Sequence, residues 1–214
     1  MTKIIVFDAY GTLFDVNAAA RIYAKSNDDE NFLRSWEKLS SLWMEKQISY
    51  TWYYTSMGHK TNFWKVTEDA LDYALDYYQL SNSPNLRDNL LSLYKELSLF
   101  PEVLEVLKKL KKKGFTLAIL SNGTTDMLNS AVQKADISKY LTAIISAEDL
   151  GFFKPHNQIY SKVLQRFSCK PTEVIFVSSN GWDAVGGSAF GFHSLWVNRN
   201  GLPEEKMFWS PTWL

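Results

Sequence analysis

The chain has 214 residues, a length that predicts one domain or one domain with a sizeable insertion. Its 23 Lys and Arg side chains balance 23 Asp and Glu side chains, and only five of the cations are arginine. Proteins that follow a nucleic-acid backbone depend on clustered positive charge, so this balance argues against a nucleic-acid partner.

The cysteine content and the hydropathy pattern indicate a cytoplasmic location. Cys169 is the single cysteine, so the chain forms no intrachain disulfide, which favours a reducing compartment. Four apolar residues precede Asp8, too few for a signal peptide, and no apolar run approaches the length of about 18 residues that spans a bilayer. We therefore expect no membrane partner.

Short apolar runs recur along the chain, and each ends in small or polar residues. They cover residues 4–7, 116–120, 142–145, 174–177 and 194–197. Continuous apolar runs of this length are typical of strands buried on both faces, and therefore of a parallel sheet. Helical periodicity lies between them, at 101–113, 127–135 and 155–167. This alternation predicts an α/β fold with a Rossmann-like parallel sheet.

Residues 16–98 interrupt the alternation, because they contain several helical periods and no convincing strand. The periodicity predicts helices within 32–50 and near 70–77 and 86–97. We expect a Rossmann-like core formed by residues 1–15 and 99–214, with residues 16–98 inserted after the first strand as a helical cap. Such a cap can exclude water from a reacting centre. Its aromatic segment, 50–54, fits either the interior of the cap or a pocket wall and subunit contact.

Polar side chains follow the predicted strands. Asp8 comes directly after the first strand, Ser121 and Asn122 end the second, and Asp183 lies shortly after the strand at 174–177. Lys154 stands in the loop region between later elements. Because parallel strands end at one edge of a sheet, we expect these carboxylate, hydroxyl, amide and ammonium groups to converge.

The order and identity of these residues resemble the haloacid dehalogenase superfamily of aspartate-nucleophile hydrolases. The closer resemblance is to its L-2-haloacid dehalogenase (type II) family. It rests on segments 7–13, 120–123 and 176–183, on Lys154 with Tyr160, and on further matches at 191–192, at 196–199 and within 41–52. The resemblance therefore covers nearly the whole chain.

Two features separate this chain from the phosphatases of that superfamily, which generally carry a second aspartate two residues after the nucleophile and a further acidic residue in the last motif. Here Tyr10 stands two residues after Asp8, and residues 178–180, before Asp183, carry hydroxyl and amide side chains. Hard divalent cations prefer several oxygen ligands, mainly carboxylates. We therefore expect a site without metal or other cofactor, and a phosphatase is the less favoured alternative.

The resemblance implies a chemical mechanism. Asp8 attacks the α-carbon of an (S)-2-haloalkanoate, displaces halide with inversion and forms an ester that water hydrolyses. Asp183 activates the water, and Lys154 keeps Asp8 ionised and oriented. The resemblance further implies a homodimer acting on a small molecule, with these site residues: Thr12, Ser178 and Asn180 around Asp8, Ser121 on the substrate carboxylate, Asn122 facing the halide, and Tyr10, Tyr160 and Trp182 in the pocket.

One departure from the family lies in the cap, where Met44 replaces an arginine expected to bind the leaving halide. At about 100° per residue, no cation shares its helical face. Methionine offers polarizable surface but no charge-assisted hydrogen bond, and losing such a donor typically costs about 10²–10³ in rate. Three alternatives follow: a weakened dehalogenase, a hydrolase of another small substrate, or a catalytically silent binding protein. The retained Asp8, Lys154 and Asp183 favour hydrolase chemistry.

Overall fold

The computed structural model describes residues 4–213, which fold around one five-stranded parallel sheet with strand order β3-β2-β1-β4-β5. The strands are β1 (Ile4–Phe7), β2 (Thr116–Ser121), β3 (Ala143–Ser146), β4 (Val174–Ser178) and β5 (His193–Trp196). Phe7, the last residue of β1, pairs with Ile119 on one side and with Val177 on the other, and β2 and β4 continue past this level by two residues and one residue. The prediction of a Rossmann-like sheet is confirmed.

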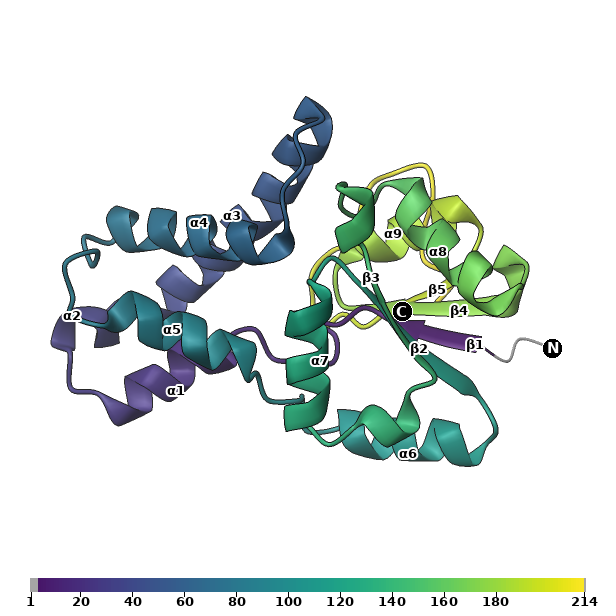
Figure 1. Cartoon of the computed structure of the whole chain (residues 1–214), viewed down its shortest axis with the longest axis horizontal. Coiled ribbons are helices and arrows are strands. Elements are labelled where there is room, and N and C mark those ends of the chain that lie inside the picture. The colour runs from purple at the N-terminus through teal and green to yellow at the C-terminus, as the bar shows by residue number, and fades with distance from the viewer. Residues whose placement is uncertain (1–3, 214) are drawn as a thin grey trace.

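Two layers of helices cover the sheet (Figure 1). Helices α6 (Val103–Lys112) and α7 (Thr125–Lys134) lie on one face, and α8 (Asn157–Phe167) and α9 (Gly181–Phe190) on the other. Successive side chains of β1 point to opposite faces of the sheet. Ile5 and Phe7 belong to the core cluster under α6 and α7, and Val6 belongs to the cluster under α8. This double burial explains why the strands read as continuous apolar runs. Short 3-10 helices lie at Ser138–Tyr140, Glu148–Leu150 and Pro171–Glu173.

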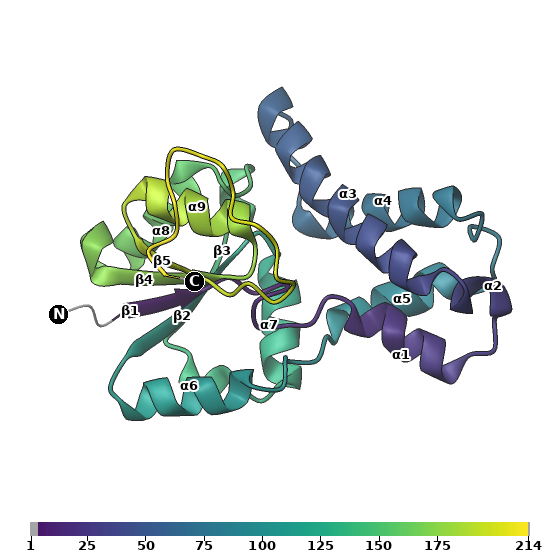
Figure 2. The same ribbon diagram turned by 180° about the vertical axis from the view of Figure 1, so that it is seen from behind.

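The remaining helices form a separate layer beside the ends of the strands, called the helical layer below (Figure 2). They are α1 (Ala18–Ser26), α2 (Glu30–Leu33), α3 (Trp36–Met57), α4 (Phe63–Tyr77) and α5 (Leu86–Lys95). The location of α3 to α5 agrees with the sequence periodicity, whereas α1 and α2 were not expected as separate helices. The division into a core and a cap at residues 15/16 and 98/99 stays a prediction. None of the described helices is both long enough and apolar enough to cross a bilayer.

The chain passes between the sheet and the helical layer through two neighbouring segments, residues 12–16 and 97–102, called the paired connections below. The Asp15 N–H donates to the Ser98 carbonyl oxygen (2.9 Å), and the Phe100 N–H donates to that of Leu13 (3.0 Å). Buried Phe14 bridges to Leu99 between them. One apolar core cluster continues from the sheet through these connections into the helical layer, so the two parts pack on each other directly.

Candidate active site

Asp8 lies at the end of the central strand, where a tight turn sets the direction of its carboxylate. Its backbone N–H donates to the Val177 carbonyl oxygen (2.8 Å), which extends the pairing of β1 with β4 by one residue. The Ala9 carbonyl oxygen then accepts the N–H groups of Leu13 (2.8 Å) and Phe14 (3.0 Å). Gly11 has a φ of 86°, a value that glycine adopts without steric cost. The turn leaves Asp8 only 6% exposed at the sheet edge.

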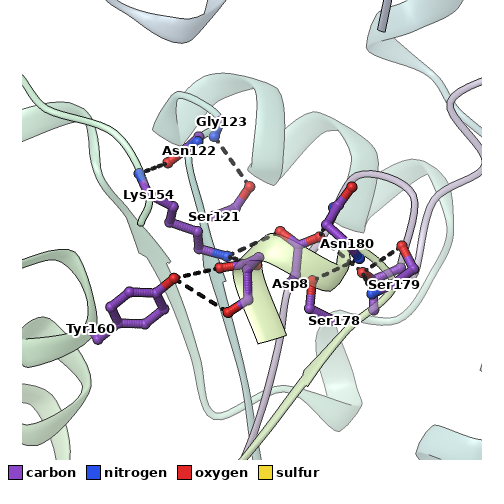
Figure 3. Close-up of polar contacts among 11 residues, drawn as sticks. Asp8, Ser121, Asn122, Gly123, Lys154, Tyr160, Ser178, Ser179 and Asn180 are labelled. Carbon is purple, nitrogen blue, oxygen red and sulfur yellow. Dashed lines mark hydrogen bonds and ion pairs between the residues drawn. The ribbon is translucent and has the colours of Figure 1, made fainter. Parts of the chain in front are cut away.

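Three side chains donate hydrogen bonds to the Asp8 carboxylate (Figure 3). Thr12 Oγ1 (2.9 Å) and Asn180 Nδ2 (3.3 Å) donate to Oδ2, and Lys154 Nζ (3.1 Å) donates to Oδ1. Ser178 acts one step away, because its Oγ accepts the Asn180 N–H (3.2 Å). Of the three residues expected around Asp8, two therefore contact the carboxylate and one orients a residue that does.

Lys154 lies between two carboxylates and is 1% exposed. Besides Asp8, its Nζ donates to Asp183 Oδ2 (2.9 Å). Burial on its own lowers the pKa of Lys154, but the charges of Asp183 and Asp8 outweigh it and raise that pKa above its ordinary value. Burial raises the pKa of Asp183, and Asp8 adds to the effect while Lys154 opposes it. The ammonium thus stays charged and fixes both carboxylates.

Tyr160 does not lie where the sequence led us to expect it. It is fully buried, lies outside the lining of the cavity described below, and its hydroxyl donates to Asp183 Oδ1 (2.7 Å). The pocket-wall prediction is wrong because α8 turns this side chain toward the interior, where its ring packs edge-on against Phe176. Asp183 is likewise 0% exposed and lies outside the cavity lining. Its role in water activation stays a prediction.

A cavity of about 40 Å³ separates the sheet edge from the helical layer. A water molecule takes about 10–15 Å³ of such space, so the cavity suits a ligand of a few non-hydrogen atoms. The strand ends and their loops contribute Asp8, Tyr10, Ser121, Asn122, Lys154 and Asn180, and the first turn of α9 contributes Trp182. The helical layer contributes Met44, Gln47, Ile48, Thr51 and Phe63, and Val16 comes from the first connection.

The sheet side of the cavity carries polar groups with unused donors. Ser121 Oγ accepts the Gly123 N–H (3.2 Å), which leaves its hydroxyl proton free to donate. Asn122 Oδ1 accepts the Lys154 N–H (2.8 Å), which leaves its amide protons. A side chain at Gly123 would meet the Tyr10 ring at 2.7 Å, so glycine allows Tyr10 to lie against this loop. The sheet side can therefore bind an anion.

The side chains on the helical side of the cavity are either apolar or hydrogen-bonded within the helical layer. Gln47 Nε2 donates to Thr67 Oγ1 (2.6 Å), and Gln47 Oε1 accepts the Tyr94 hydroxyl (3.2 Å). Thr51 Oγ1 donates to the Ile48 carbonyl oxygen (2.6 Å). Among the described residues that line the cavity, Lys154 is the one cation. The helical side thus presents a surface suited to an alkyl chain.

Sequence and structure comparisons agree on the family. The sequence model of the haloacid dehalogenase-like hydrolases matches residues 2–191. The chain belongs to this family. The (S)-2-haloacid dehalogenase 4A of Burkholderia cepacia is 44% identical over 203 residues, which cover 95% of this chain and 86% of its own. The (S)-2-haloacid dehalogenase 1 of Pseudomonas sp. (strain CBS-3) is 41% identical over 203 residues, covering 95% of this chain and 87% of its own.

Solved structures of such hydrolases have the same fold. A crystal structure of a dehalogenase superposes with a TM-score of 0.92 at 41% identity, covering 99% of this chain and 91% of its own. The L-2-haloacid dehalogenase from Xanthobacter autotrophicus with chloropropionic acid covalently bound has a TM-score of 0.83 at 36% identity, covering 93% of this chain and 78% of its own.

The acidic groups of this haloacid dehalogenase-like hydrolase do not fit a divalent cation. Within residues 4–213, no three His, Cys, Asp or Glu side chains come together as a set of metal ligands. Asp8 and Asp183 are the two carboxylates at the centre, and both bind Lys154. A metal ion would have to displace that buried ammonium and would find fewer carboxylates than hard cations usually take.

Five lining residues were not among those expected at the site. Gln47, Ile48 and Thr51 lie three, four and seven positions after Met44, so they share its helical face, and this spacing was the available signal. Val16 and Phe63 lie in irregular or helix-starting segments, and no periodicity in the sequence singles them out.

Proposed function

We propose that this hydrolase is an (S)-2-haloacid dehalogenase, which replaces the halogen of a small (S)-2-haloalkanoate by hydroxyl through an ester on Asp8, without a metal ion. The observation that carries the proposal is the Asp8 carboxylate on the wall of a small cavity, held by Lys154, with a tyrosine and no acidic residue at position 10. Relatives at 44% and 41% identity bear this name, which supports the same reaction here.

The first step is a displacement by one oxygen of Asp8. Oδ2 accepts two hydrogen bonds, from Thr12 and Asn180, whereas Oδ1 accepts one from Lys154 among the described residues. A carboxylate oxygen has room for about two, so we assign the attack to Oδ1. Its lone pair forms a bond to the α-carbon, the carbon–halogen bond breaks, and the halide leaves with the bonding electrons.

The second step returns Asp8 to its carboxylate form. Ester formation removes the negative charge of Asp8, which leaves Asp183 as the one charged partner of Lys154 among the described residues. Water attacks the carboxyl carbon of Asp8 and gives one proton to Asp183. The ester bond to the substrate oxygen then breaks, that oxygen takes the proton from Asp183 and leaves as the 2-hydroxy acid, and Asp8 releases the remaining proton of the water to solvent. Burial raises the pKa of Asp183, which makes it a better proton acceptor than an ordinary carboxylate.

The two walls of the cavity match the two ends of such a substrate. We assign the substrate carboxylate to the Ser121 hydroxyl and the departing halide to the Asn122 amide, because both keep unused protons. The alkyl group would lie against Ile48 and Trp182. Met44 supplies no charge to the halide, so we expect slow turnover of poor leaving groups.

Halide release from (S)-2-chloropropionate, measured with excess chelator, tests the proposal. We expect release by the native protein, and none from the R enantiomer, because holding the carboxylate at Ser121 and the halide at Asn122 turns the back of the carbon–halogen bond toward Asp8 in one enantiomer only. Asp8→Asn should abolish release, a loss of about 10⁴-fold or more. Asp126→Asn, at an exposed position on α7, is the matched control and should match the native enzyme.

A single turnover in ¹⁸O-labelled water separates covalent catalysis from direct attack by water. The ester route places the label in Asp8 first, which adds 2 mass units to the peptide that contains it. Absence of halide release contradicts the dehalogenase proposal and favours another hydrolase or a binding protein. Release that requires Mg²⁺ favours metal-dependent chemistry.

The composition of the chain and the family resemblance also suggest where the enzyme acts and how it assembles. We expect it to act on a small molecule in the cytoplasm, without a nucleic-acid or membrane partner, and as a homodimer. The homodimer rests on the family resemblance, and sedimentation of the purified chain would test it. The location and the assembly stay predictions.

A further inference from the structure

Arg199 lies beyond β5, outside the cavity lining, and reaches the paired connections. Its Nη2 donates to the Thr12 carbonyl oxygen (2.9 Å), and its Nη1 forms an ion pair with Glu102 Oε1 (2.6 Å). The guanidinium carbon lies 3.7 Å from the centre of the Phe100 ring. One side chain from the C-terminal part of the sheet layer therefore holds both connections.

These contacts need a guanidinium. Its planar fork donates to two acceptors at fixed angles while its face lies on an aromatic ring, whereas the compact ammonium of lysine cannot do both. Burial raises the pKa of Glu102, but its own backbone N–H and Arg199 outweigh this effect and lower it, so the carboxylate is ionised. The Arg199 side chain is 21% exposed and the Glu102 side chain 50% exposed, so water screens the pair from the Glu102 side.

Thr12 links Arg199 to the proposed nucleophile. Its carbonyl oxygen accepts from Arg199 (2.9 Å), while its hydroxyl donates to Asp8 Oδ2 (2.9 Å) and accepts the Ser179 N–H (2.8 Å). Residue 12 is thus held at both its backbone and its side chain. Movement of this residue would turn the Asp8 carboxylate.

The same contacts lie where the helical layer joins the sheet. Every described helix of that layer lies between the two connections in sequence, so the connections are its covalent links to the sheet. The Phe100 N–H donates to the Leu13 carbonyl oxygen. Arg199 adds a second link beside this hydrogen bond, because it contacts Thr12 in the first connection and Phe100 in the second. Met44 and its neighbours line the cavity from this layer.

We propose that Arg199 is a positioning residue, which orients Asp8 through Thr12 and holds the helical layer over the cavity by tying the paired connections together. Its effect on turnover rests on the proposed function, whereas its effect on the connections does not. A displacement of about 1 Å at a reacting group can cost 100-fold in rate, so loss of these contacts should lower kcat without any direct contact to substrate.

Arg199→Ala tests the proposal with two independent measurements. Hydrogen exchange should become faster in peptides that cover 12–16 and 97–102 and stay unchanged in β2. The kcat for halide release should fall by about 10- to 100-fold, and added guanidinium ion should restore part of it. Arg199→Lys should remain close to Arg199→Ala, because it keeps the charge and loses the fork.

Arg34→Met is the matched control, because Arg34 is an exposed arginine paired with Glu30 on the helical layer. It should leave exchange and kcat unchanged, and guanidinium should not stimulate it. If Arg199→Ala does not fold, Glu102→Gln removes one contact and should speed exchange at 97–102 with a loss in kcat of roughly two- to tenfold.

Native kcat in Arg199→Ala overturns the proposal, and so does native exchange in the connections. A lower kcat that guanidinium does not raise also contradicts it, because general destabilisation would then explain the loss. Absence of halide release by the native chain would count against the proposed function alone, since the exchange experiment still tests the cross-link.

Discussion

The two walls of the cavity differ in almost every physical property. The sheet wall is charged and densely hydrogen-bonded, and it comes from residues at the ends of parallel strands. The helical wall is apolar at Met44 and Ile48, and its Gln47 side chain is bonded within its own layer. Under the proposed function, we expect the sheet wall to perform the chemistry and the helical wall to select the substrate and exclude water.

Lys154→Met gives the largest test of the sheet wall. It leaves Asp8 and Asp183 buried without a cation between them, a change that typically costs about 3–5 kcal/mol in the free energy of unfolding. Halide release should fall by about 10³-fold, because Asp8 loses its positioning charge. Urea unfolding and initial rates measure both effects. Lys65→Met, at an exposed lysine paired with Asp69, should change neither, and a stable, active Lys154→Met enzyme would refute this division of roles.

Met44→Arg tests whether the helical wall lacks catalytic charge. The new guanidinium would donate to the leaving halide, so release should rise by about 10- to 100-fold. The gain should be larger for 2-chloropropionate than for the bromo compound, because chloride is the poorer leaving group. Ser41→Arg, on the same helix at an exposed position, is the control. Equal rates for Met44→Arg and the native enzyme would show that this position does not limit turnover.

The pH dependence of halide release should reflect the ionisation of side chains on the sheet side of the cavity. Asp183 must be ionised to accept a proton, and its pKa is raised above the ordinary 3.8. Activity should therefore decline, about tenfold per pH unit, as pH falls through a value above 3.8. The pKa of Lys154 is raised above 10.5, so no alkaline loss should occur below that pH. Burial also raises the pKa of Tyr10, which stays neutral. Rates measured where circular dichroism shows a folded chain would check this profile, and a plateau extending below pH 3.8 would contradict it.

Tyr160→Phe should have the smallest effect, because Tyr160 supports the sheet wall from behind. The variant removes one hydrogen bond to the buried Asp183 carboxylate, which lowers the free energy of unfolding by about 1–3 kcal/mol. Urea unfolding measures the change, with the exposed Tyr77→Phe as control. A change in the preferred length of the substrate chain would instead mean that Tyr160 shapes the cavity.

Sequence reasoning predicted the sheet wall better than the helical wall. The strands were predicted to within about one residue, because double burial makes them continuous apolar runs. The positions of Asp8 and Ser121 followed from the ends of those strands, whereas Lys154 lies in a loop eight residues after β3. In the helical layer, α1 was missed because its buried face is built from Ala18 to Ala20, which give no stripe of large apolar residues.

Side-chain direction limited the prediction of the site. Tyr160 lies close to the site in space, but only the packing of α8 determines that it faces Asp183 instead of the cavity. Phe63 enters the cavity because α4 begins beside it, which no local pattern reveals. Such placements depend on tertiary packing between elements distant in sequence.

The central position of β1 determines how early in synthesis the sheet around Asp8 can form. Ile4 pairs with Thr116 and with Val174, so the strand that carries Asp8 leaves the ribosome long before either neighbour exists. Such non-local pairing is slow to form. A nascent chain that ends before residue 174 already contains Asp8 but lacks Asn180 and one side of the sheet. The Asp8 carboxylate therefore gains its complete set of hydrogen-bond partners only after residues 174–180 have been made.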